Sequence, residues 1–156
     1  MRWLSVLALL LLVCTACEKP PEPAPPETLE DVLRAMASAV AGQAPRKILD
    51  RVGHDFVTRD GLDFGGVQAL VLEFLTREQR YEAEIESLVI EEAAERGVAG
   101  EPARRVRATV RFAPAGSFEA TRYRLDLVFR QRLGRWMASS GSYQRLSRGS
   151  DEAEQG

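Results

Sequence analysis

The stretch FEATRYRLDLVFRQRLGRWMASSGSY, residues 118–143, decides how this chain folds. Between positions 123 and 131 every second side chain is uncharged, and most of those between them are charged. A period of two is typical of a β-strand with one face in water. The pair Leu133-Gly134 predicts a tight turn, after which Trp136 returns opposite Gln131. Because a hairpin cannot cover its own apolar face, we expect other elements to pack against it.

Two segments upstream show the same alternation and complete a sheet of four long antiparallel strands. Residues 81–90 change phase at Ser87-Leu88, which predicts a β-bulge. Residues 105–112 alternate apolar side chains with arginine and threonine. If the polar loop between these segments is symmetric, Glu82 faces Arg111 on the outer surface of the sheet.

Three helices are predicted before the long strands. Thr28 can cap the first, whose apolar residues recur at spacings of three and four. Pro45 suits the start of the second helix, and Gly53 is its expected stop. A short strand pair around the Asp60-Gly61 turn comes next, and the third helix follows Gly65-Gly66. The expected class is α+β, with three N-terminal helices packed on a curved antiparallel sheet.

A targeting sequence occupies the N-terminus. Residues 3–16 carry no charge; this run is too short for a membrane-spanning helix, which needs about 20 residues, but it suits the core of a signal peptide. Its end, VCTAC at 13–17, resembles the lipobox of bacterial lipoproteins, and that resemblance implies lipidation of Cys17. The alternative is an ordinary secretory signal with two incidental cysteines.

These features divide the chain into four segments. We expect a lipoprotein signal peptide over 1–16, a lipidated cysteine and proline-rich tether over 17–27, a folded domain over 28–146 and a disordered tail over 147–156. Five of the eight prolines lie in the tether and favour an extended spacer. The implied location is the cell envelope, with the domain anchored by lipid to a bacterial membrane and facing the periplasm.

Composition argues against several classes of function. Both cysteines lie at positions 14 and 17, so the expected domain has no thiolate for a disulfide, a nucleophile or a zinc site. With His54 as the one histidine, we predict no metal and no cofactor. The formal net charge of -2 argues against a nucleic-acid partner.

The order of the predicted elements resembles the nuclear transport factor 2-like (NTF2-like) superfamily, which includes SnoaL-like proteins. The likeness is carried by HDFV at 54–57, Asp60-Gly61, the alternating strands and GRWM at 134–137. It covers about residues 29–145 and implies a cone-shaped fold, a pocket at the wide end, and dimers formed through the outer sheet face. This fold hosts isomerases, dehydratases and non-catalytic domains, so it implies no single activity.

Inward-facing side chains of the expected cone are the candidates for lining a pocket. They are Met36, Val40, Phe56, Phe74, Tyr81, Phe112, Tyr123, Phe129 and Trp136, with Gln131 and Ser140 as polar contacts. Such residues also suit a plain apolar core, and we expect Trp136 to serve the core. No catalytic residue is predicted, because alternation places the strand carboxylates outside. It leaves His54 and Asp55, expected at the exposed end of the second helix, as the candidates.

The sequence therefore favours an anchored envelope lipoprotein with a non-enzymatic domain that binds a small hydrophobic ligand or a protein partner. One alternative is an isomerase, dehydratase or hydrolase of this fold that acts on a small organic substrate. Another is an accessory subunit of an envelope complex. The arginine-rich outer face of the sheet would suit a partner or a second copy, but its glutamates make a plain charged surface equally compatible.

Overall fold

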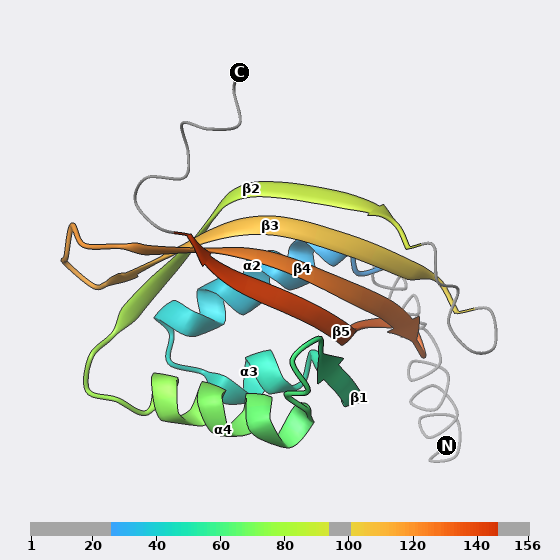
Figure 1. The fold of residues 1–156 in the computed structure, drawn as a ribbon, viewed down its shortest axis with the longest axis horizontal. Helices are drawn as coiled ribbons and strands as arrows, with labels where there is room; N and C mark the ends of the chain where they lie inside the picture. Colours follow the sequence, from blue (N-terminus) through green and yellow to red (C-terminus); the bar gives the residue numbers. More distant parts are fainter. Residues whose placement is uncertain (1–25, 94–100, 147–156) are drawn as a thin grey trace, which may run out of the picture.

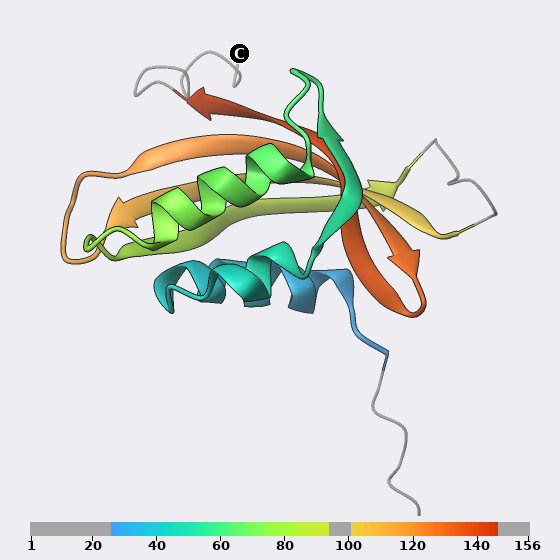
Figure 2. The ribbon, with the colours of Figure 1, turned by 90° about the horizontal axis from the view of Figure 1, so that it is seen from below.

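The computed structural model describes residues 26–93 and 101–146. The helices are α2 (Leu29–Ala41), α3 (Pro45–Leu49) and α4 (Phe64–Leu75), and the strands are β1 (Val52–Thr58), β2 (Tyr81–Glu92), β3 (Ala103–Pro114), β4 (Thr121–Arg132) and β5 (Arg135–Leu146). The strand order is β1-β5-β4-β3-β2. The helices of the described region all cover one concave face of the curved sheet (Figure 1, Figure 2). This arrangement confirms the predicted α+β architecture.

Several predictions concern residues outside the described ranges. The expected signal peptide, Cys17, most of the tether and the C-terminal tail all lie there. Within the described residues, no helix is both long enough and apolar enough to cross a membrane.

The hairpin of β4 and β5 forms as the alternation predicts. Gln131 pairs with Trp136, and Phe129 pairs with Ala138. Leu133 and the following glycine have φ values of 49° and 78°. Positive φ at both central positions is the geometry of a type I′ turn, whose twist matches that of the strands it joins.

The hairpin of β2 and β3 contains the predicted bulge but has a different register from the one expected. The pairing shifts between Ile85 and Ser87, and this shift keeps the later apolar side chains of β2 on the concave face. Glu84, rather than Glu82, lies opposite Arg111. Apolar pairs facing the core set this register, so the symmetry of the loop was a poor guide to it.

The segment after α3 differs from the expectation. The second helix ends at Leu49 instead of continuing to Gly53, and Gly53 lies within β1. A Cβ on Gly53 would lie 3.0 Å from the carbonyl oxygen of Ala138 on β5. Glycine is therefore needed because two backbones approach closely, and it does not act as a helix stop. In place of a short strand pair, β1 runs parallel to β5, with an isolated bridge between Val57 and Asp63.

The apolar core lies between α2 and the middle of the sheet. Phe129, Val32 and Val106 are its most completely enclosed side chains. Trp136 belongs to the same cluster and is 9% exposed. The core therefore closes the end of the molecule near the β4–β5 turn and leaves the other end to a cavity.

Candidate functional site

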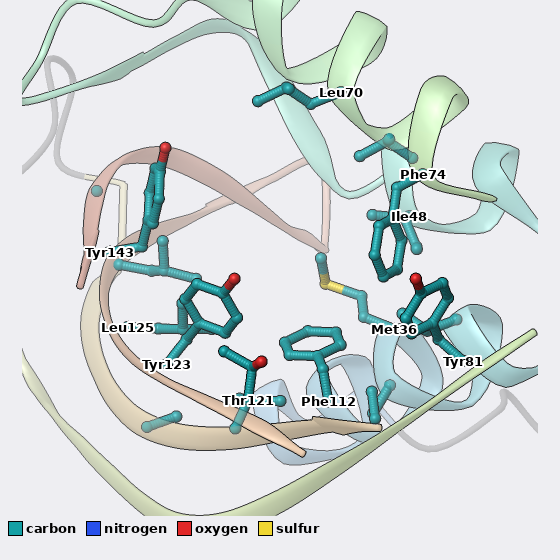
Figure 3. Close-up of a pocket in the computed structure, with 18 of the residues that line it drawn as sticks. Met36, Ile48, Leu70, Phe74, Tyr81, Phe112, Thr121, Tyr123, Leu125 and Tyr143 are labelled. Carbon is teal, nitrogen blue, oxygen red and sulfur yellow. The ribbon is translucent and has the colours of Figure 1, made fainter. Parts of the chain in front are cut away.

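A large cavity separates α4 from the concave face of the sheet (Figure 3). Its volume is about 1240 Å³. Side chains of α2, α4 and all five strands contribute to the wall, and most of them are apolar. Apolar residues of α4, including Val71, line the cavity on the side opposite the sheet.

Four aromatic rings form a continuous wall within the cavity. Phe74 of α4 has its ring centroid 4.3 Å from that of Tyr81 and 6.3 Å from that of Phe112. Phe112 in turn meets Tyr123 at 5.7 Å in an edge-on arrangement. Such tilted and edge-on contacts stabilise aromatic pairs beyond their burial. This wall therefore offers both ring faces and ring edges to a bound molecule.

Polar atoms are few in the cavity and come mainly from hydroxyl groups. All three tyrosines of the chain, Tyr81, Tyr123 and Tyr143, line it. The hydroxyl oxygens of Tyr81 and Tyr123 point into the space between α4 and the sheet (Figure 3). A phenolic hydroxyl both donates and accepts a hydrogen bond. A mostly apolar wall with a few directed hydroxyls is the usual composition of a small-molecule site.

Charged side chains border the cavity at its mouth. Glu119, in the loop before β4, and Arg145, near the end of β5, are the charged members of the lining. Two other side chains of the lining are half exposed, Tyr143 at 54% and Leu70 at 49%. The mouth therefore carries both signs of charge around an apolar opening.

The structure brings seven of the eleven predicted pocket residues together. They are Met36, Val40, Phe56, Phe74, Tyr81, Phe112 and Tyr123. The other four, Phe129, Gln131, Trp136 and Ser140, are not part of the lining. Three of these lie near the β4–β5 turn, where α2 and the core close the sheet.

Ser140 is displaced from the cavity by a bulge in β5 that was not predicted from the sequence. Val128 pairs with Ser140 and Phe129 with Ala138, so Ser139 is an extra residue in β5. Its hydroxyl donates to the carbonyl oxygen of Val128 at 3.1 Å. The bulge shifts the phase of the strand, and Tyr143 and Arg145 line the cavity instead. Restarting the alternation at Gly141 would have identified both residues.

The two catalytic candidates lie on β1 and outside the cavity lining. His54 is exposed, as expected, but it lies on a strand and not at a helix end, and its ring packs against Phe64 at 4.5 Å between centroids. Asp55 accepts two hydrogen bonds from Arg132, at 2.9 and 2.6 Å. This guanidinium lowers the pKa of Asp55. The carboxylate is thereby held ionised in an ion pair that joins β1 to β4.

The outer face of the sheet is occupied by ion pairs between neighbouring strands. Arg105 donates two hydrogen bonds to Asp126, at 2.8 and 2.7 Å, and these lower the pKa of that carboxyl. Arg107 donates to Glu91 at 2.8 Å. These pairs correspond to the plain charged surface foreseen as an alternative to a partner site. In the described part of the chain, no group of three or more His, Cys, Asp or Glu side chains is arranged to hold a metal ion.

Solved structures share this architecture at low sequence identity. An NTF2-like protein of unknown function from Pseudomonas putida KT2440 has a TM-score of 0.60 and 12% identity, over 74% of this chain and 82% of its own. A cystatin-like protein of unknown function from Nostoc punctiforme has a TM-score of 0.59 and 7% identity, over 76% of this chain and 89% of its own. The helical cell shape determining protein Pgp2 from Campylobacter jejuni has a TM-score of 0.61 and 11% identity, over 72% of this chain and 38% of its own.

The sequence matches no protein-family model and no curated protein. At identities this low, the likeness to solved structures concerns the fold and carries no information on activity. The curved sheet and the helices on its concave face agree with the fold of these neighbours. The chain therefore carries a domain of the NTF2-like fold.

Proposed function

We propose that this protein is an envelope lipoprotein whose NTF2-like domain binds a small hydrophobic ligand in the cavity. The observation that carries the proposal is the cavity of about 1240 Å³ with an apolar wall and an open mouth. Exposing this much apolar surface costs stability, which binding of an apolar molecule would recover. The anchoring part rests on the lipobox resemblance at Cys17.

The distribution of polar groups supports binding rather than acid–base catalysis. The charged residues of the lining, Glu119 and Arg145, lie at the mouth, where water screens them. His54 and Asp55 lie on β1, away from the lining, and Asp55 is engaged by Arg132. Inside the cavity, the hydroxyls of Tyr81 and Tyr123 suit a ligand that carries a single polar oxygen on an apolar body.

A fluorescent probe tests this function directly. N-phenyl-1-naphthylamine is apolar, uncharged and brighter in an apolar site, so we expect it to bind the wild-type domain in the micromolar range. Ala83 lines the cavity opposite Phe112, and Ala83→Phe would fill part of the space. We expect this variant to weaken probe binding at least tenfold.

Glu84→Phe is the matched control, because it adds the same ring to the adjacent residue on the outer face. It should leave probe binding unchanged. Near-ultraviolet circular dichroism establishes that both variants are folded. If the wild-type domain binds no probe, or if both variants lose binding equally, the proposed function is wrong.

A further inference from the structure

The N-terminal segment joins the domain at one end, and the cavity mouth lies at the other. The start of α2 and the β4–β5 turn lie at one end, which we call the tether end (Figure 1, Figure 2). The β3–β4 loop, residues 115–120, lies at the opposite end, beside the cavity mouth. The described chain begins at Pro26, so the segment from Cys17 joins the domain at the tether end.

Leu133 is the most exposed large apolar side chain at the tether end, with an exposed fraction of 104%. It occupies the first central position of the turn, with φ at 49°. Glycine and asparagine adopt this conformation at little cost, whereas leucine does not. Leucine is thus disfavoured here both by its backbone conformation and by its exposure to water. A side chain that is unfavourable in both respects, with no compensating contact inside the domain, suggests a role in binding something outside the domain.

Charge distinguishes Leu133 from the equally exposed apolar residue at the other end. Arg132 and Arg135 flank the turn; Arg132 is paired with Asp55 and Glu101, whereas Arg135 is exposed. At the mouth end, Phe118 is 100% exposed, but the charges there are of both signs: Glu119 follows it directly, and Arg145 borders the same mouth. A surface that presents apolar and cationic groups together suits a bilayer with anionic lipids, whereas an apolar group beside a carboxylate suits it less.

The length of chain outside the described domain restricts which end approaches the membrane. Nine residue steps separate Cys17 from Pro26, and a chain of this length spans at most about 30 Å. A 12-residue strand such as β4 is about 40 Å long. A lipid on Cys17 therefore keeps the tether end near the bilayer surface. It also makes docking an intramolecular event, for which a weak contact suffices.

We propose that Leu133 and Arg135 form a docking surface for the bilayer that holds the lipid anchor. Leu133 enters the headgroup region, and Arg135 pairs with anionic phosphates. The tether end then faces the membrane, and the cavity mouth faces away from it, open to the aqueous compartment. This proposal rests on the anchoring part of the proposed function, but it is independent of what the cavity binds.

The test uses residues 17–156, in which Cys17 is the one thiol. This thiol is coupled to a maleimide lipid in vesicles of phosphatidylcholine with phosphatidylglycerol, so the outcome does not depend on lipidation in cells. Leu133→Trp and the matched control Phe118→Trp each place a fluorescent reporter at one end. Trp136 is buried and present in both variants, so its signal cancels in the comparison.

Brominated lipids quench tryptophans that contact the bilayer. We expect Leu133→Trp to be quenched at least twice as strongly as Phe118→Trp. Adding Arg135→Glu to Leu133→Trp should reduce the quenching to the level seen in vesicles without phosphatidylglycerol. Equal quenching of the two reporters, or stronger quenching of Phe118→Trp, would overturn the proposal. Failure of Cys17 lipidation in cells, read from the mass of the mature protein, would instead contradict the proposed anchoring.

Discussion

Asp55 and Arg132 are far apart in the sequence, yet they join β1 to the end of β4. Two hydrogen bonds from Arg132 lower the pKa of Asp55, and burial opposes this effect. A carboxyl whose pKa is lower in the folded state stabilises the fold above its unfolded pKa of about 4. This contribution is lost as the pH falls through the folded value. Because the Asp55 side chain is 46% exposed, its contribution is at most about 1 kcal/mol.

We therefore expect Asp55→Asn to lower the free energy of unfolding at pH 7 and to have a smaller effect as the pH falls below the unfolded pKa of Asp55. Urea unfolding of the wild type and the variant, followed from pH 7 to pH 3, measures this difference. Glu78→Gln, at an exposed position in the loop before β2, should not change the stability at either pH. A difference that persists undiminished at pH 3 would show that the Asp55 charge is not the cause.

Trp136 returns after the turn with its ring in the core. Truncation of a buried aromatic side chain typically costs about 3 to 5 kcal/mol. We expect Trp136→Ala to lower the urea midpoint strongly or to prevent accumulation of the folded protein. Met137→Ala, on the adjacent residue of β5, should cost much less. A stable Trp136→Ala protein that has lost only probe binding would place this residue in the site instead.

The conformation of Leu133 also predicts a gain in stability. Asparagine tolerates the left-handed region better than leucine, so Leu133→Asn should raise the free energy of unfolding by about 1 kcal/mol. Leu133→Ala is the control, since it removes the side chain without relieving the backbone. An unchanged urea midpoint for Leu133→Asn would show that the turn carries no such cost.

At the scale of elements, the contact of β1 with β5 depends on Gly53. An added methyl would lie 2.6 Å from Oδ1 of Asp55 and 3.0 Å from the carbonyl oxygen of Ala138. Since Arg132 holds Asp55 in place, neither group can move away freely. We expect Gly53→Ala to destabilise the protein by about 1 to 3 kcal/mol.

Gly65→Ala is the matched control for this element, because a Cβ there would meet an oxygen of Asp63 at an ordinary 3.5 Å. In the first turn of α4 this change should be neutral or slightly stabilising. If Gly53→Ala unfolded no more easily than Gly65→Ala, β1 would not be held as closely as the structure shows.

At the scale of the whole molecule, the lipobox resemblance predicts where the protein resides. A single acyl chain binds membranes only marginally, so stable anchoring needs the two or three chains of a mature lipoprotein. We expect Cys17→Ser either to release the domain into the aqueous fraction or to leave an uncleaved precursor. Cys14→Ser should have no effect on either property. Cell fractionation and the N-terminal mass distinguish these results, and an unchanged Cys17→Ser protein would contradict the assignment.

The sequence by itself determined the α+β class, the four long strands, the β4–β5 turn and the bulge in β2. Each of these depends on local side-chain periodicity or on glycine and turn chemistry, which neighbouring residues specify. The pocket candidates on the strands were also predictable, because alternation assigns each side chain to a face. Seven of the eleven pocket candidates meet in the cavity.

The tertiary structure decided the features that depend on contacts between distant segments. Parallel pairing of β1 with β5 overrode a local pattern that resembled the end of a helix around Val52 and Gly53. The extra residue at Ser139 reversed the phase of β5 and brought Tyr143 and Arg145 to the cavity. Whether the cone is filled or open was decided by how far α4 lies from the sheet. That distance results from the packing of the whole domain, so no single stretch of sequence specifies it.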